Sequence, residues 1–188
     1  MFKDPVLKKL YKKYGPHQFE DRSKRLLEEL VESIISQQLS NKAADTIYNR
    51  FLALFGNKFP LTKQLLDIDI EKLRSAGMSY SKGQYIKNIT KAFKEKELVI
   101  ENIIKLSDEE VIKELTKIKG IGKWTAEMTL IFTLKREDVF SIGDAGLKRA
   151  IKKLYNLEKD SEILKLSQKW KPKRSHASWY LWRSLEND

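Results

Sequence analysis

Apolar side chains recur at helical spacing along nearly the whole chain. Intervals of three and four residues predict helices over about 5–13, 22–37, 41–55, 61–67, 69–75, 81–95, 145–155, 160–168 and 171–185. Two more amphipathic runs flank a glycine turn near residue 121. Glycine (8 residues) and proline (4) are few, and alternating β-branched runs are scarce. The pattern therefore predicts an all-α fold.

Residues that favour helix ends mark several of these boundaries. Ser40 has the character of a helix N-cap, and Ser107 with Glu110 forms a capping-box sequence. Gly56 ends a helix, and Pro172 is expected in the first turn of the last helix. The chain shows no long linker, repeat or low-complexity tract.

Composition narrows the kinds of chemistry that are available. The 188 residues carry a net charge of +11, which favours a polyanionic partner, although a lysine-rich proteome would give the same excess. The absence of cysteine excludes disulfides, thiolate nucleophiles and cysteine-ligated metals, and two histidines make a histidine metal site improbable. With no signal-peptide pattern and no long apolar run, we expect a soluble cytoplasmic protein.

The turn Gly120-Ile121-Gly122 joins two amphipathic runs into a helix-hairpin-helix. We expect both glycines to adopt positive φ and to leave the backbone uncovered. The N–H groups that begin the second helix then form an anion site, surrounded by Lys117, Lys119 and Lys123. This favours non-specific binding of a DNA phosphate. The alternative is an ordinary tight turn between packed helices.

Asp144 follows the hairpin by about twenty residues, at the end of the segment Phe140–Asp144. Taken alone, an Asp at the start of a helix is most simply an N-cap. The functional interpretation depends on the hairpin, which would place DNA nearby.

Three segments together resemble the helix-hairpin-helix DNA glycosylases, and most of all the 3-methyladenine DNA glycosylase II (AlkA-like) branch. They are the hairpin followed by Gly-Asp144, the run Trp170–Trp182, and the run Ile34–Ala44. The resemblance spans roughly residues 26–185. It implies a compact all-helical glycosylase domain, without the N-terminal β-rich domain of enterobacterial relatives. Lobe A would cover about 30–135, with the hairpin at 115–128, and lobe B about 1–29 plus 136–188, with the active-site cleft between the lobes.

The resemblance also assigns chemistry. Asp144 would be the catalytic carboxylate, stabilising positive charge on the sugar and orienting water. Trp124 occupies the position at which bifunctional relatives carry a Schiff-base lysine, so we expect a monofunctional enzyme without a lyase step. Trp124 and Trp182 would stack on an electron-poor base. Met128 stands where some relatives have an aromatic residue, which would widen the pocket.

DNA contacts are implied at further positions. Gln38, with Leu39 and Ser40, would fill the gap left by an extruded nucleotide, although the glutamine pair could simply end a helix. Trp170 and Arg174 are expected to pack and pair structurally, and Trp179 to lie in the core. The implied DNA-binding set is Gln38, Leu39, Ser40, Tyr80, Ser81, Lys82, Lys117, Gly120, Gly122, Lys123 and Lys148. A cation held by hairpin carbonyls near Ile118 and Gly120 could assist, and no other cofactor is expected.

The sequence thus predicts a monofunctional DNA N-glycosylase that removes alkylated purines of the 3-methyladenine and 7-methylguanine type in base excision repair. Its partner would be double-stranded DNA containing a damaged base. We expect a monomer associated with the nucleoid, with no membrane or protein partner. Alternatives are a non-catalytic protein that binds damaged DNA, and a glycosylase for deaminated or oxidised bases. A purely structural basic bundle is disfavoured because several motifs coincide.

Overall fold

The computed structural model describes residues 2–186, and every regular element in that range is helical, which confirms the all-α prediction. Two compact units are present: Arg22–Thr129, and a unit made from the two ends of the chain, up to Asp21 and from Leu130 onward. The sequence interpretation placed these boundaries later, near residues 29 and 135. None of the helices in the described range is long and apolar enough to cross a membrane.

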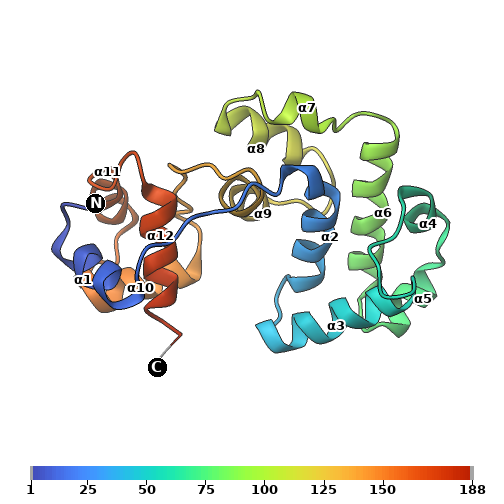
Figure 1. The fold of residues 1–188 in the computed structure, drawn as a ribbon, viewed down its shortest axis with the longest axis horizontal. Coiled ribbons are helices and arrows are strands. Elements are labelled where there is room, and N and C mark those ends of the chain that lie inside the picture. Colours follow the sequence, from blue (N-terminus) through green and yellow to red (C-terminus); the bar gives the residue numbers. More distant parts are fainter. Residues whose placement is uncertain (1, 187–188) are drawn as a thin grey trace. The chain divides into compact units, whose positions relative to one another are not determined.

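The unit of residues 22–129 is built around α2 and α6, which pack on one another and are shown in Figure 1. Its buried stripe includes Leu30 and Ile34 of α2 with Ile86 and Ile89 of α6, all without solvent exposure. Along the chain the helical elements are η1 (Ser23–Arg25), α2 (Leu26–Ser36), α3 (Asn41–Ala53), α4 (Thr62–Asp67), α5 (Ile70–Ser75), α6 (Tyr80–Lys94), α7 (Ile100–Ile103), α8 (Asp108–Thr116) and α9 (Lys123–Met128).

The helix caps predicted at Ser40 and Ser107 are present in this unit. The Ser40 hydroxyl accepts the Ala43 N–H at 3.4 Å, at the start of α3. Ser107 and Glu110 complete the capping box: the serine hydroxyl accepts the Glu110 N–H at 3.3 Å, and the glutamate accepts the Ser107 N–H at 2.8 Å. These reciprocal bonds fix the start of α8, the helix that leads into the hairpin.

The structure differs from the prediction at three places. Residues 23–25 form a 3₁₀ turn before α2 starts at Leu26. The four-residue α7 was not predicted, because so short a helix shows no periodicity. After the hairpin, α9 passes directly into a π-helical segment, η2 (Thr129–Thr133), where a continuous α-helix was expected.

The unit formed by the chain ends contains α1 (Pro5–Tyr14), α10 (Ala145–Tyr155), α11 (Asp160–Gln168) and α12 (Arg174–Arg183). Figure 1 shows α12 beside α1 and α10, on which it packs. Trp170 (2% exposed) lies in this core, and its indole N–H donates to the Asp4 carboxylate at 3.3 Å. Pro172 precedes α12, which begins at Arg174, so the prediction of Pro172 in a first turn was wrong.

Candidate active site and DNA-binding hairpin

Gly120 occupies a position that only glycine fits. Its φ is +116°, and a Cβ there would lie 2.4 Å from Cγ of Tyr85, a residue of α6. The neighbouring hairpin carbonyls are held from two sides. The Gln37 amide donates to the Gly120 carbonyl at 3.3 Å, and the Asn88 amide donates to that of Lys119 at 3.1 Å. The hairpin is therefore fixed to α6 and to the end of α2.

Gly122 leaves the backbone uncovered as predicted, but with a different backbone conformation. Its φ of −89° is open to any residue, so the expectation of positive φ at both glycines was wrong here. Gly122 is the N-cap of α9, which no side chain caps, and no atom lies within 4 Å of a Cβ built on it. Glycine at this position leaves open space above backbone N–H groups, and an anion could approach there.

The three predicted lysines around the hairpin are exposed. Lys117 pairs with Glu114 at 2.6 Å, and Lys123 lies 3.8 Å from the buried Glu127. The exposed pair of Lys117 with Glu114 is weak and can exchange for a phosphate, and the ammonium of Lys123 is exposed although its partner is buried. The carbonyls suggested as cation ligands accept protein donors: Ile118 from the Ile121 N–H at 3.0 Å, and Gly120 from Gln37. The bound cation stays a prediction.

The segment predicted to plug the duplex is an exposed turn after α2. Gln38 is exposed and has φ +60°, which is uncommon for a residue other than glycine. Leu39, 36% exposed, and Ser40 follow it on the surface. Gln37 points inward instead, because its amide contacts Gly120 and the Thr125 hydroxyl, each at 3.3 Å. Of the two glutamines, Gln38 is the exposed one, and its role as a plug stays a prediction.

Three residues of the predicted DNA-binding set, Tyr80, Ser81 and Lys82, lie in the first turn of α6. The Lys82 ammonium donates to the carbonyls of Ile35 and Gln37, each at 2.8 Å, so it is committed to protein groups. Tyr80 is 56% exposed, but its hydroxyl donates to Glu71 at 2.6 Å. Ser81 lies exposed in the first turn of α6. Lys82 thus has a structural role in the free protein, and its contact with DNA stays a prediction.

Asp144 is 8% exposed and is the N-cap of α10. Its Oδ1 accepts two hydrogen bonds, from the Leu147 N–H at 2.7 Å and from the indole Nε1–H of Trp182 at 2.9 Å. Both donors fix the rotation of the carboxyl group. Lys148, in the first turn of the same helix, pairs with Asp160 at 2.7 Å. The N-cap interpretation of Asp144 is thus correct, and a second donor acts on the same oxygen.

Two residues beside Asp144 or beside the indole of Trp182 were missed from the sequence. Gly146 is one: a Cβ there would lie 3.1 Å from Asp144 Oδ1 and 3.2 Å from Cδ1 of Trp182. Phe132 is the other, 36% exposed, with its ring 5.7 Å from that of Trp182 at a tilt of 35°. Gly146 gives the indole room to reach the carboxylate, and Phe132 extends the aromatic surface beside it. The unusual Asp-Ala-Gly start of a helix was the available signal for Gly146.

The other predicted pocket residues belong to the unit of residues 22–129. Trp124 is 43% exposed in the first turn of α9, and Met128, at its end, is half-buried. An exposed indole presents a large aromatic surface to solvent, on which a planar ligand can stack. Its exposure is consistent with a ligand contact.

The Trp170–Trp182 run also holds the loop that leads to Asp144. Arg174 donates to Asp138 through Nε (2.8 Å) and Nη2 (3.0 Å), as its predicted structural pairing requires. The Ser175 hydroxyl accepts the Val139 N–H at 3.0 Å. Trp179, one turn further, stacks on His17 with centroids 3.8 Å apart and is half-buried. Trp182, further along the same helix, donates to Asp144.

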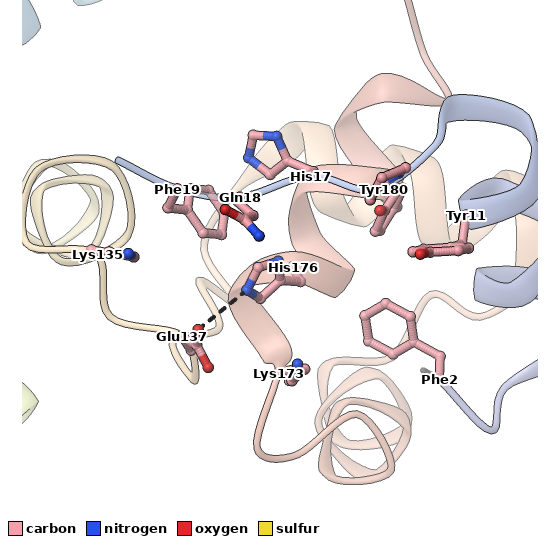
Figure 2. A pocket seen from close by; sticks show the side chains of 11 residues that line it. Phe2, Tyr11, His17, Gln18, Phe19, Lys135, Glu137, Lys173, His176 and Tyr180 are labelled. Atoms are coloured by element: carbon pink, nitrogen blue, oxygen red, sulfur yellow. Dashed lines mark ion pairs between the residues drawn. The ribbon is translucent and has the colours of Figure 1, made fainter. Parts of the chain in front are cut away.

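A cavity of about 460 Å³ lies elsewhere in the unit formed by the chain ends, and Figure 2 shows its lining. Its walls include aromatic rings and the charged groups of Lys135, Lys173 and Glu137, with His176 3.8 Å from Glu137. None of the predicted site residues lines it.

Burial lowers the pKa of His17 beside this cavity, and the nearby His176 and Arg183 lower it further. Because the folded pKa lies below the unfolded value of about 6.5, the unfolded chain binds more protons at acidic pH. Stability should be complete above about pH 6.5 and should fall as the pH drops. Melting curves between pH 7.5 and 5.5 will show this decline, and His17→Phe, which keeps an aromatic ring against Trp179, should reduce it. Part of the decline should remain, because burial also lowers the pKa of His176. An equal decline in both proteins would assign it to other groups.

With this geometry established, comparisons place the chain among known proteins. A family model described as "HhH-GPD superfamily base excision DNA repair protein" matches residues 31–173. DNA-3-methyladenine glycosylase 1 of Schizosaccharomyces pombe is 39% identical over 189 residues, covering 95% of this chain and 80% of that protein. The structure of the 3-methyladenine DNA glycosylase of that yeast, in complex with abasic DNA, gives a TM-score of 0.87 at 37% identity, over 97% of this chain and 92% of that one. A DNA-3-methyladenine glycosidase of Bacillus halodurans gives 0.79 at 32% identity, over 98% and 91%. The chain therefore belongs to the helix-hairpin-helix (HhH-GPD) superfamily of base excision DNA repair proteins.

Proposed function

We propose that this protein is a monofunctional DNA N-glycosylase that extrudes and excises alkylated purines of the 3-methyladenine and 7-methylguanine type. The observation that carries the proposal is the geometry of Asp144, a nearly buried carboxylate whose Oδ1 is held by both a helix N–H and an indole N–H. The relatives named as 3-methyladenine glycosylases support the substrate class.

Asp144 is suited to stabilise the transition state of glycosidic cleavage. When the bond between C1′ and the base nitrogen breaks, its electron pair leaves with the base and positive charge builds on the sugar. A fixed carboxylate stabilises that charge without having to reorganise. Water then adds to C1′ and loses a proton, for which the carboxylate is an acceptor. An alkylated purine is cationic and leaves readily, so a single carboxylate suffices.

A lyase step is not expected. A Schiff base needs a lysine amine at the sugar, and Trp124 stands at the position that carries it in bifunctional relatives. The exposed indole of Trp124 instead suits stacking on a cationic base. We assign the hairpin to a DNA phosphate, at the uncapped start of α9 over which Gly122 leaves open space.

The test is release of free bases from methylated duplex DNA, with the products separated by chromatography. We expect free 3-methyladenine or 7-methylguanine, abasic DNA without strand cleavage, and no covalent adduct on borohydride treatment. A trapped adduct would indicate a bifunctional enzyme. No release of any base despite tight DNA binding would favour a non-catalytic protein. Gel filtration and cell fractionation would test whether it acts as a cytoplasmic monomer.

Replacing Trp182 with Phe should slow excision while DNA binding persists. The variant keeps an aromatic face but loses the Nε1–H that donates to Asp144. Hydrogen bonds to charged groups contribute about 1.5–3 kcal/mol, which corresponds to a single-turnover rate lower by about 10- to 100-fold. Affinity for abasic DNA should change little.

Trp179→Phe is the matched control, since it makes the same change on the same helix at a residue that stacks on His17. It should leave the rate unchanged. If Trp182→Phe excises at the wild-type rate, the indole serves only as a surface.

A further inference from the structure

The exposed turn at residues 36–39 has a conformation that its sequence does not favour. The Leu39 N–H donates to the Ser36 carbonyl at 3.1 Å, which closes a β-turn. Gln37 has φ −50° and ψ 129°, and Gln38 has φ +60°. These angles describe a type II turn, whose third position normally carries glycine or asparagine. Glutamine there is strained, so the surrounding structure must hold it.

A type I turn would remove the strain, because it gives both central residues negative φ. The two forms differ mainly by rotation of the central peptide, here the one that joins Gln37 to Gln38. That rotation reverses the direction of the Gln37 carbonyl. It would also redirect the Gln38 side chain.

Lys82 binds that carbonyl. Its ammonium donates to the Gln37 carbonyl and to that of Ile35, in the last turn of α2, each at 2.8 Å. Charge-assisted bonds are stronger than neutral ones, and a cation is favoured at a helix C-terminus. The half-buried position lowers the pKa of Lys82 through desolvation, as expected for a group withdrawn from water. The Gln37 side chain adds a second anchor, at Gly120 and Thr125.

We propose that Lys82 is a positioning residue for base extrusion: it holds the peptide between Gln37 and Gln38 in the type II orientation and so presents Gln38 to the DNA. Gln37 ties the same turn to the hairpin, so the plug and the phosphate site share one support. This inference rests on the proposed function, because it assumes that the turn meets DNA. It departs from the expectation that Lys82 contacts a phosphate.

Lys82→Met keeps the aliphatic stem and removes the donor. In the free protein, a strong NOE between Hα of Gln37 and the Gln38 N–H marks type II, whereas a strong NOE between the two N–H groups marks type I. We expect the first pattern in wild type and the second in the variant. An unchanged type II pattern in Lys82→Met would overturn the proposal.

Measurements of DNA binding and of excision supply a second test, which distinguishes a lysine that positions the turn from one that contacts a phosphate. Removing a phosphate contact lowers the slope of log K against log salt by about 0.9. We expect Lys82→Met to leave the slope at the wild-type value, to weaken the fluorescence increase of 2-aminopurine at the extruded site, and to slow single-turnover excision by about 10- to 100-fold. Lys123→Met, on the exposed hairpin lysine, is the control and should lower the slope without changing the turn. A lower slope for Lys82→Met would restore the phosphate role.

Should Lys82→Met fail to fold, the double variant with Gln38→Gly decides. Glycine accepts positive φ without strain, so it should restore folding and the type II pattern in the absence of the lysine. Failure of glycine to restore them would show that Lys82 acts elsewhere. The NOE measurement needs no catalysis. It therefore tests the turn even if no substrate is ever cleaved, and activity with an unchanged turn would contradict this inference alone.

Discussion

Asp144→Asn is expected to abolish base release while leaving the fold and DNA binding intact. Asparagine is as good a helix N-cap as aspartate, and its oxygen can accept the bonds from the Leu147 N–H and the Trp182 indole. The shape is conserved and only the negative charge is lost. Removal of one electrostatic contact to a transition state costs about 10²- to 10³-fold in rate, and loss of a full charge should cost at least that. Single-turnover excision from methylated DNA, beside affinity for abasic DNA, measures both quantities.

The matched control makes the same change at another N-cap. Asp69 caps α5 by accepting the Glu71 N–H at 3.0 Å, so Asp69→Asn repeats the chemistry of the substitution away from Asp144. It should excise normally. If Asp144→Asn also excises normally, the carboxylate is only a cap. If it loses thermal stability and binding together, its role is structural.

Gly120→Ala is expected to disrupt the hairpin, because the new Cβ would lie 2.4 Å from Cγ and 2.5 Å from Cβ of Tyr85, at a φ of +116°. Overpacking and an unfavourable backbone conformation together should cost about 2–5 kcal/mol. A chain of this size should melt about 2–4 °C lower for each kcal/mol. DNA affinity should fall with the loss of the hairpin. Thermal melting and DNA titration measure the two effects.

Gly122→Ala, two residues away, should behave oppositely. Its φ of −89° suits alanine and its Cβ meets no protein atom, so the melting temperature should stay near wild type. The methyl group would instead occupy the space assigned to the phosphate, so DNA affinity should fall without loss of stability. Equal DNA affinity for Gly122→Ala and wild type would remove the phosphate from this position.

The helices could be predicted because their signals are local. Apolar spacing located α10 and α11, and the serine caps marked the starts of α3 and α8. The π-helical segment after α9 could not be predicted, because its apolar pattern resembles that of an α-helix. Family resemblance led to Asp144 where local reasoning favoured only a cap.

The contacts that organise the candidate site depend on partners distant in sequence. Lys82 has the composition of a phosphate ligand, and only the fold shows that its ammonium reaches α2. Trp182 was expected to be an aromatic surface, and its donor role requires Asp144, 38 residues away. The two hairpin glycines look alike in sequence, and only the structure distinguishes them, by the positive φ of Gly120 and by the closeness of Tyr85 to it. A sequence can propose such residues, but the assignment of their contacts requires the packed structure.

Helix α12 holds both ends of the segment that carries Asp144. Arg174 and Ser175 bind its start at Asp138 and Val139, and Trp182, two turns later on the same helix, binds Asp144 at its end. The segment of residues 138–144 is therefore held at both ends and is not a mobile loop. Its carboxylate is ordered during folding, so arrival of DNA need not restrict it further. We expect the backbone of residues 138–144 to show order parameters typical of a helix in the free protein. We also expect the rate of excision to be insensitive to solvent viscosity, because this segment does not have to move before the bond is cleaved.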